Sequence, residues 1–227
     1  MSGAHARVVL ATRNAKKVPE MQAILTEAGI PAEVVGLTGF PDAPEVPETE
    51  PTFAGNALLK ARAIARHTGL PAVADDSGLR VDELNGMPGV LSARWSGSFG
   101  DAAPDKDAAN LRLVLDQLAD TPAERRGAEF VAAAALAVPA RAGDAGGRDA
   151  GEDAAAEGIA LEDVVEGVLR GRLLDHPRGG NGFGYDPIFV PEGETRTTAE
   201  MTAAEKNAIS HRGIAFRKLA ERLREVL

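Results

Sequence analysis

Apolar segments of strand length alternate with amphipathic helical segments along the whole of this 227-residue chain. Arg7–Thr12 has the pattern of a short buried strand, and apolar residues then recur at helical spacing from about Lys16 to Ala28, where Gly29 favours a helix end. This mixing of strands and helices restricts the chain to the α/β class. Its length fits one large domain or two small lobes, because domains contain roughly 100–200 residues.

Helix caps, turn residues and apolar spacing predict the remaining elements. Further strands are expected at 33–37, 72–74, 79–81 (pairing back on 72–74), 129–138 and 159–169. Further helices are expected at 52–68, at 105–118, after the capping box of Thr202 and Glu205, and at 211–227 with Ser210 as cap. The pattern of 129–138 also fits a helix, but we favour a strand because a long loop and a second strand-like segment follow it.

Two stretches are expected to be loops. Residues 40–51 contain four prolines among acidic residues, which excludes a regular element. Ala140–Gly158 contains only Ala, Gly, Asp, Glu and Arg. No aliphatic side chain larger than alanine anchors this second stretch, so we expect a flexible loop at 140–158 between the two strands of a long hairpin.

Composition excludes several classes of protein. The chain has no cysteine, which excludes a disulfide scaffold, thiol catalysis and cysteine-bound metal clusters. Its formal net charge of −9 argues against a broad surface for a nucleic acid polymer. The longest apolar run, Val131–Ala140, is too short to cross a bilayer, and no signal-peptide pattern occurs near Met1. We therefore expect a soluble cytoplasmic protein without a membrane partner.

The segment 12–17, TRNAKK, lies between a predicted strand and a predicted helix. Backbone amides at a helix N-terminus favour anions, whereas lysines there oppose the helix dipole. Two lysines at this end are explained if a phosphate binds beside them. The alternative is an ordinary strand–turn–helix corner with solvated lysines, and neither GxxxxGK[ST] nor GxGxxG occurs in the chain.

The acidic segment Asp75-Asp76-Ser77-Gly78 directly follows the predicted strand 72–74. Carboxylates at a strand end are suitable ligands for Mg²⁺, which prefers oxygen. Neighbouring strand side chains alternate between faces, so at most one of the two aspartates points straight into a cleft unless the strand has ended. The alternative is a turn bent at Gly78. Glu48 and Glu50 are candidates for a further metal ligand, and spacing does not choose between them.

Two C-terminal segments carry further candidates. The glycine-rich segment 179–187 contains Phe183 and Tyr185, which would either stack on a base or anchor the turn to the core. Lys206 precedes Ser210 by one helical turn, and Arg212 at the start of the last helix can bridge two oxygens of a phosphate or base edge. A surface position is the alternative for these cations. Together the four segments contain the parts needed to bind a nucleoside triphosphate.

Five segments, read in order, resemble the inosine triphosphate pyrophosphatase family: LATRNAKKVPEM, ETEPTFAGNALLKA, AVADDSGLRVDELNGMPGVLSARWSG, GFGYDPIF and EMTAAEKNAISHRGIAF. The resemblance covers nearly the full chain except Ala140–Gly158. Arg13 departs from it, because the family usually has glycine there, and Asn181 is also unusual. The resemblance implies a long twisted mixed β-sheet flanked by helices in two lobes with a central cleft, one domain over residues 1–227, and a homodimer.

The resemblance also implies roles for individual residues. The triphosphate loop would consist of Thr12, Arg13, Asn14, Ala15, Lys16 and Lys17. Asp76 would be the proton acceptor and a Mg²⁺ ligand, Glu48 a second ligand, and Ser77 a substrate contact. The base pocket would be lined by Phe183, which stacks on the purine, with Gly184, Tyr185 and Asp186. Lys206 would reach phosphate or ribose, and His211 and Arg212 would read the base.

The activity implied is hydrolysis of a non-standard purine nucleoside triphosphate (ITP, dITP or XTP) to the monophosphate and pyrophosphate. Selectivity would come from a donor to the 6-carbonyl, such as Arg212, because adenine has an amino group there. The alternative enzyme is a Maf-type nucleotide pyrophosphatase, against which the SHR and GFGYDP segments argue. The alternative class is a nucleotide-binding regulator without hydrolysis, against which the presence of Asp76 and Lys17 argues.

Overall fold

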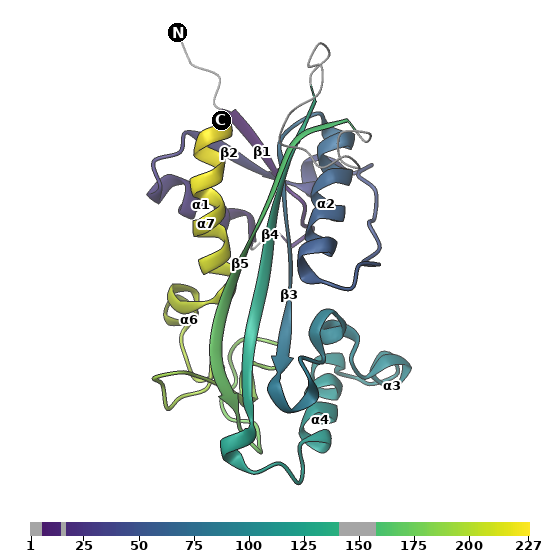
Figure 1. Ribbon diagram of the computed structural model, residues 1–227, viewed down its shortest axis with the longest axis vertical. Helices are drawn as coiled ribbons and strands as arrows, with labels where there is room; N and C mark the ends of the chain where they lie inside the picture. Colours follow the sequence, from purple (N-terminus) through teal and green to yellow (C-terminus); the bar gives the residue numbers. More distant parts are fainter. Residues whose placement is uncertain (1–5, 15–16, 141–157) are drawn as a thin grey trace. The chain divides into compact units, whose positions relative to one another are not determined.

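The structure is a computed structural model that describes residues 6–14, 17–140 and 158–227. The strands of these residues form one mixed sheet in the order β2-β1-β3-β4-β5-β6 (Figure 1). Their bounds are β1 (Ala6–Leu10), β2 (Ala32–Gly36), β3 (Ala72–Val81), β4 (Gly127–Pro139), β5 (Ile159–Leu173) and β6 (Phe189–Pro191). The strands β1 and β2 are parallel, as are β1 and β3, whereas β5 and β6 are antiparallel.

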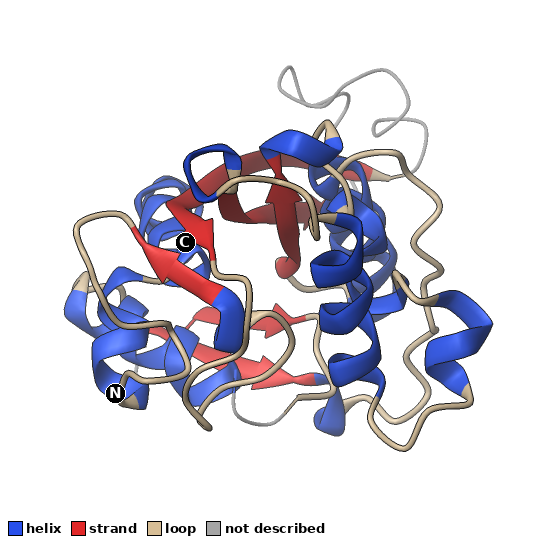
Figure 2. Ribbon diagram, turned by 90° about the horizontal axis from the view of Figure 1, so that it is seen from below, coloured by secondary structure: helices blue, strands red, loops and turns tan. Residues whose placement is uncertain are grey.

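Helices flank the strands (Figure 2). Their bounds are α1 (Lys17–Glu27), α2 (Phe53–Thr68), α3 (Gly97–Asp101), α4 (Lys106–Gln117), α6 (Ala203–Ile209) and α7 (His211–Val226). The predicted α/β sheet with flanking helices is thus confirmed. Within the described ranges, no helix has both the length and the apolar composition needed to span a membrane.

Local sequence signals account for most of the helix ends. Thr52 accepts a hydrogen bond from the amide of Gly55 at 3.0 Å and caps α2, which ends at the left-handed Gly69. Thr202 and Glu205 form the predicted capping box of α6. Ser210 Oγ accepts from the Gly213 amide at 3.0 Å, as expected for the cap of α7.

The prediction for the acidic segment was wrong in one respect. A strand was expected to end at Ala74, with residues 79–81 pairing back on it, but β3 runs without a break from Ala72 to Val81. Asp75 and Asp76 therefore lie inside a strand and are both buried. The strand continues because cationic and amide side chains of two helices pair with these carboxylates, so the segment does not need water or a turn to satisfy them.

The predicted hairpin strands are β4 and β5, which are hydrogen-bonded neighbours in the sheet. The pattern at 129–138 is thus a strand, as we favoured, and the amide of Ala140 donates to the carbonyl of Gly158 at 2.9 Å. Most of the loop predicted at 140–158 lies outside the described residues. The short elements α3 and β6 were not predicted, because five and three residues are too few for a periodic pattern.

The chain divides into two compact units. The first contains residues 1–76, 133–166 and 214–227, and the second contains 77–132 and 167–213. The chain passes from the first to the second at the peptide bond between Asp76 and Ser77, and later β4 and β5 also contribute residues to both. A single domain over residues 1–227 stays a prediction.

In the first unit, two consecutive residues of β5 show how helices cover the sheet. Glu162 forms a bidentate pair with Arg62 of α2 at 2.7 Å, and Asp163 pairs with Arg222 of α7 at 3.0 Å. Since neighbouring strand residues point to opposite faces, α2 and α7 lie on opposite faces of the sheet (Figure 1). The helix α7 also returns to the N-terminal segment, where Arg224 donates to the carbonyl of Ala28 at 2.6 Å.

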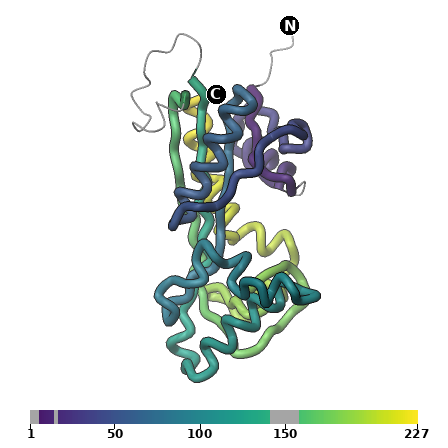
Figure 3. Tube along the Cα trace, turned by 90° about the vertical axis from the view of Figure 1, so that its right-hand side faces the viewer, coloured from purple at the N-terminus to yellow at the C-terminus, as the bar shows by residue number. Residues whose placement is uncertain are grey.

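The second unit has its own apolar core between β3, α4, β4 and the segment around β6, with Phe130 packed on Phe189 at a ring distance of 4.5 Å. Figure 3 shows the teal and light-green parts of the chain side by side in this unit. Tyr185 is part of this core, and its hydroxyl donates to the carbonyl of Ser92 at 2.8 Å. The glycine-rich segment is therefore held at a fixed place on the core.

Candidate active site

The turn between β1 and α1 is closed by local hydrogen bonds. Thr12 Oγ1 accepts from the amide of Asn14 at 3.1 Å, and the Asn14 carbonyl accepts from the amide of Lys17 at 3.1 Å. The segment thus lies between a strand and a helix, as the sequence predicted. Ala15 and Lys16, which were predicted to bind the triphosphate, lie outside the described residues. Phosphate binding by this turn stays a prediction.

Lys17 pairs with Asp75 inside the first unit. Its ammonium donates to both carboxylate oxygens at 2.9 Å, and the side chains are 20% and 3% exposed. Asp75 was part of the acidic segment but was not among the predicted site residues. The structure gives it a definite partner, namely the lysine predicted to bind phosphate.

Asp76 faces α2. Its Oδ2 accepts from Asn56 Nδ2 at 3.1 Å, and its Oδ1 lies 3.3 Å from the ammonium of Lys60. Burial raises the pKa of the Asp76 carboxyl above the ordinary 3.8; the charge of Lys60 opposes this rise and that of Glu48 adds to it. A carboxylate with a raised pKa is a better proton acceptor than an exposed one, which suits the predicted general base.

Glu48 reaches the same ammonium. Lys60 Nζ lies 3.2 Å from Glu48 Oε1 and 3.3 Å from Asp76 Oδ1, so one cation holds both carboxylates predicted as metal ligands. Among the described residues there is no group of three or more His, Cys, Asp or Glu side chains able to hold a metal. Two carboxylates nevertheless fit Mg²⁺, which commonly takes one or two carboxylates and completes its shell with water and substrate phosphates.

Sequence reasoning missed Asn56 and Lys60. They are four residues apart on α2 and therefore share one helix face beside its buried apolar residues. Asn56 is fully buried. A polar pair at this spacing beside an apolar stripe was the available signal, but partners 16 and 20 residues away cannot be read from it.

Arg13, the departure from the family pattern, contacts the loop 40–51. Its Nη2 donates to the carbonyl of Ala43 at 3.3 Å. The side chain also lines a cavity together with Glu45 and Lys60. The structure thus shows a contact of Arg13 with loop 40–51, while binding of phosphate by Arg13 stays a prediction.

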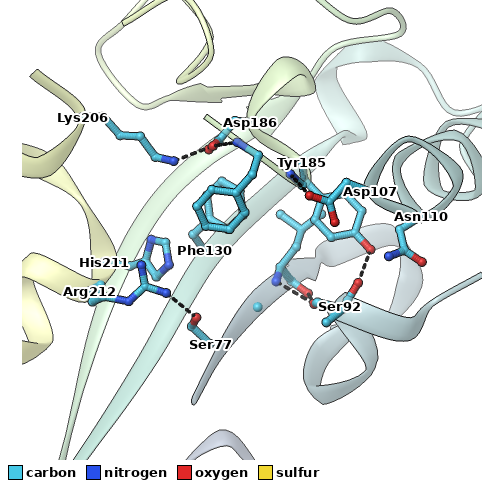
Figure 4. Close-up of a pocket in the computed structure, with 15 residues that line it drawn as sticks. Ser77, Ser92, Asp107, Asn110, Phe130, Tyr185, Asp186, Lys206, His211 and Arg212 are labelled. Carbon is cyan, nitrogen blue, oxygen red and sulfur yellow. Dashed lines mark hydrogen bonds and ion pairs between the residues drawn. The ribbon is translucent and has the colours of Figure 1, made fainter. Parts of the chain in front are cut away.

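A pocket in the second unit, with a volume of about 120 Å³, brings together the residues predicted to bind the base with two other predicted substrate contacts, Ser77 and Lys206 (Figure 4). These residues are Ser77, Phe183, Gly184, Tyr185, Asp186, Lys206, His211 and Arg212. They come from β3, the glycine-rich segment, α6 and the start of α7. The structure thus gathers segments that are more than 100 residues apart in the sequence, while binding of a base by them stays a prediction.

The two aromatic residues of the glycine-rich segment have different surroundings. Phe183 is 65% exposed, whereas Tyr185 is 5% exposed and hydrogen-bonded to Ser92. Burial raises the pKa of the Tyr185 hydroxyl, and the charge of Asp107 adds to the rise. Both alternatives weighed for this segment therefore apply, one to each ring: Tyr185 anchors the segment, and Phe183 is available for stacking.

Asp186 organises the pocket's upper wall in Figure 4. Its buried carboxylate accepts from the Phe183 amide and from Thr198 Oγ1, both at 2.8 Å, and also pairs with the ammonium of Lys206. Lys206 Nζ in turn lies 4.9 Å from the centre of the Phe183 ring. Asp186 therefore fixes both the turn that presents Phe183 and the cation beside it.

Arg212 and His211 extend from the start of α7 toward β3 and β4. Arg212 Nη2 donates to Ser77 Oγ at 3.2 Å, and the His211 ring stacks on Phe130 with centroids 5.1 Å apart. Figure 4 shows the Arg212 guanidinium pointing toward Ser77. A planar donor thus lies at the pocket wall, where it can meet an acceptor on a ligand edge.

Sequence reasoning missed several lining residues: Ser92, Asp107, Asn110 and Phe130. Asp107 Oδ2 accepts from the Gly184 amide at 3.0 Å, and Asn110 Oδ1 accepts from the amide and hydroxyl of Ser96 at 2.8 and 2.7 Å. Ser92 lies in a segment that carried the family resemblance, and the other three lie in the predicted helix 105–118 and the predicted strand 129–138, but no pattern marked them as site residues. Only the folded chain brings them to the pocket.

Comparison with known proteins gives one consistent match. Residues 8–222 match the model of the Ham1 family. A protein of Frankia alni named dITP/XTP pyrophosphatase is 57% identical over 221 residues, covering 97% of this chain and 98% of its own. The crystal structure of a nucleoside-triphosphatase / dITP/XTP pyrophosphatase from Mycobacterium abscessus is 51% identical, with a TM-score of 0.70 over 94% of this chain and 98% of that one. A HAM1 protein structure from Coxiella burnetii is 38% identical, with a TM-score of 0.79 over 97% and 99%.

Proposed function

Because this chain belongs to the Ham1 family, we propose that it hydrolyses non-standard purine nucleoside triphosphates such as ITP, dITP and XTP to the monophosphate and pyrophosphate. The similarity to enzymes named dITP/XTP pyrophosphatase extends over 97% of the chain, which supports an activity of the whole protein. The enzyme would be a hydrolase that removes such nucleotides from the nucleotide pool.

The observation that carries this proposal is the arrangement around two consecutive residues of β3. Asp76 shares one ammonium with Glu48, and Ser77, the next residue, lines the pocket that contains Phe183 and Arg212. Carboxylates and lysines suit the phosphate end of a nucleotide, and an exposed aromatic ring and a guanidinium suit its base. The first unit thus carries groups suited to phosphates, and the second unit carries groups suited to a base.

In the proposed mechanism, Asp76 accepts the proton of the water that attacks the α-phosphorus. Its Oδ2 accepts a hydrogen bond from the side-chain amide of Asn56, whereas its Oδ1 lies toward Lys60 and Glu48. The two oxygens therefore have different partners. We propose Mg²⁺ as the divalent ion, held by Asp76 and Glu48. When bound, this ion neutralises charge that develops on the departing pyrophosphate.

The triphosphate would bind at Thr12, Arg13, Asn14, Ala15, Lys16 and Lys17, where α1 begins. Amides at a helix N-terminus and two lysines together suit an anion of this charge. Lys17 is held by Asp75 at 2.9 Å and is therefore oriented before substrate arrives. Lys206 would contact phosphate or ribose, near the Phe183 ring that stacks on the purine.

Base selection would depend on His211 and Arg212, which would read the base, and on amides of the pocket. Hypoxanthine and xanthine have an acceptor at the purine 6-position, whereas adenine has a donor. A donor opposite adenine would leave a buried polar group unpaired, at a cost of about 1–3 kcal/mol. We further propose a homodimer located in the cytoplasm, as the family resemblance implies, without nucleic acid polymer or membrane partners.

Pyrophosphate release with Mg²⁺ tests the function directly. The purified protein is compared on ITP, dITP and XTP against ATP and GTP at equal concentration. We expect kcat/KM to be at least tenfold higher for the non-standard nucleotides than for ATP, as a mismatch of about 1.4 kcal/mol would give. Guanine has the same 6-carbonyl, so a low rate with GTP would require a separate contact that disfavours its 2-amino group. A folded protein that releases no pyrophosphate from any of them would support the nucleotide-binding regulator instead.

A further inference from the structure

Both the oxygen and the nitrogen of the Asn56 side-chain amide form hydrogen bonds. The side chain is fully buried, its Oδ1 accepts from the amide of Glu50 at 2.9 Å, and its Nδ2 donates to Asp76 Oδ2 at 3.1 Å. One end therefore holds the main chain of the loop 40–51, and the other holds the proposed general base. No role in binding or catalysis was predicted for this residue from the sequence.

The loop needs such a support because it lacks regular secondary structure from residue 41 to 52. Glu48 lies in this loop two residues before Glu50. The loop also approaches α2 closely, since a Cβ added to Gly55 would lie 2.6 Å from Glu50 Cβ. Gly55 and Asn56 together thus hold the loop against the first turn of α2. The contact is made at Glu50, two residues from Glu48.

The same amide distinguishes the two oxygens of Asp76. Its Oδ2 is engaged by Asn56, whereas its Oδ1 lies on the side of Lys60, whose ammonium also meets Glu48. Without the amide, the carboxylate would be free to rotate about its last bond. Both carboxylates would then have to be ordered when a cation binds, which costs conformational entropy.

We propose that Asn56 is a positioning residue that holds the Glu48 loop and the Asp76 carboxylate ready for one divalent cation. This inference rests on the proposed function, because it assigns Glu48 and Asp76 to the metal of that reaction. It differs from a role in packing alone. A packing residue would affect the stability of the fold, whereas a positioning residue affects cation affinity beyond its effect on stability.

Two variants and a matched control separate these roles. Asn56→Ala removes both hydrogen bonds. Gly55→Ala keeps Asn56 but displaces Glu50 from the helix, while alanine favours the helix itself. The control is Gln22→Ala in α1, whose side-chain amide also holds main chain at both ends, donating to Ala32 O at 3.0 Å and accepting from Val34 N at 2.9 Å. Neither of these two hydrogen bonds of Gln22 involves a carboxylate.

The probe is Mn²⁺ added to the full-length protein without nucleotide, with free Mn²⁺ measured by electron paramagnetic resonance. We expect the dissociation constant to rise at least fivefold in Asn56→Ala and in Gly55→Ala, and to change less than twofold in Gln22→Ala. Hydrogen exchange at 44–51 should become faster in the first two variants only. If Asn56→Ala does not fold, Gly55→Ala and hydrogen exchange carry the test.

Three results would overturn the proposal: unchanged Mn²⁺ affinity in the folded site variants, an equal loss in Gln22→Ala, or no Mn²⁺ binding by the unmodified protein. Failure of the proposed function gives a different result, because the unmodified protein would then release no pyrophosphate from ITP or XTP. The nucleotide-free Mn²⁺ measurement does not depend on that reaction, so the two failures are distinguishable.

Discussion

Asp75 and Asp76 are consecutive residues of β3, and their carboxylates pair with lysines from two different helices. Lys17 of α1 holds Asp75, and Lys60 of α2 holds Asp76. Neighbouring strand side chains point to opposite faces, so the acidic pair supplies one charge to each face of the sheet. The result is two separate ion pairs, of which only the Asp76 pair also includes Glu48.

The Asp75 pair should contribute to stability. Asp75 is 3% exposed and Lys17 is 20% exposed, so Asp75→Asn would leave an ammonium poorly hydrated. Breaking a buried pair costs about 3–5 kcal/mol; the partial exposure of Lys17 lowers our expectation to about 2 kcal/mol of unfolding free energy. Urea unfolding measures the loss. The double variant with Lys17→Met should recover much of it, and an additive double loss would contradict a specific pair.

Asp76→Asn should affect turnover far more than binding. The amide can still accept from Asn56, but it cannot take the proton of the attacking water. We expect kcat for ITP to fall by about 10²–10⁴, the range for loss of a general base, while the nucleotide still binds in isothermal titration calorimetry. Asp82→Asn is the control, because Asp82 directly follows β3, is half exposed and pairs with Arg170. Turnover of Asp76→Asn at the unmodified rate would show that another group accepts the proton.

The raised pKa of Asp76 predicts a pH dependence of stability in metal-free protein. A carboxyl with a raised folded pKa binds more protons in the folded than in the unfolded state, so its ionisation lowers stability as pH rises. Burial is the main cause of the raised pKa. Stability should therefore fall over a pH range that begins at the ordinary pKa of 3.8 and ends above the raised pKa. The unfolding free energy of Asp76→Asn minus that of the unmodified protein should grow across this window. A constant difference from pH 4 to pH 8 in urea titrations with chelator would contradict the raised pKa.

The sequence predicted the helix ends and most strands because their causes are local. Thr52, Gly69 and the pair Thr202 and Glu205 act on neighbouring amides and carbonyls, so a window of a few residues contains the signal. The continuity of β3 through Asp75 and Asp76 could not be read in this way. Its cause is a set of partners on α1 and α2, which lie 16 to 58 residues away.

The same difference between local and long-range causes applies to the candidate site. The family resemblance supplied Asp76, Glu48 and part of the lining of the second-unit pocket, and the structure brings the latter residues to one cavity. Asn56 and Lys60 lie inside a segment that carried the resemblance, yet their roles depend on which side of α2 meets β3. Phe130 is an ordinary strand residue by pattern. Phe130 lines the pocket beside His211, and this long-range contact has no signal in the sequence.

The two aromatic residues of the glycine-rich segment should separate binding from stability. Phe183→Ala removes an exposed ring, so the unfolding free energy should change by less than about 0.5 kcal/mol. The KM of this variant for ITP should rise about 5- to 150-fold, as loss of about 1–3 kcal/mol of base stacking predicts. Tyr185→Phe should instead lower stability by about 1 kcal/mol, because the Ser92 carbonyl loses its donor. Denaturation and steady-state kinetics measure both effects. If Phe183→Ala lowered stability and Tyr185→Phe raised the KM, the two rings would have the opposite roles.

Arg126 should stabilise the second unit through hydrogen bonds to main-chain carbonyls. It is 6% exposed and donates to the carbonyls of Leu118 at 2.7 Å, Thr121 at 2.9 Å and Leu174 at 3.3 Å. Leu118 is the C-cap of α4, where the helix dipole favours a cation.

The neighbouring residue Arg125 provides a matched control, because its side chain is 62% exposed and pairs with Glu83 at the surface. Arg126→Met keeps the apolar stem but leaves buried carbonyls without a charged donor, so we expect a loss of about 2–4 kcal/mol of unfolding free energy. Arg125→Met should cost less than about 1 kcal/mol, as for exposed ion pairs. Guanidinium unfolding of both variants measures the difference. Equal losses would mean that the buried hydrogen bonds of Arg126 contribute no more than a surface ion pair does.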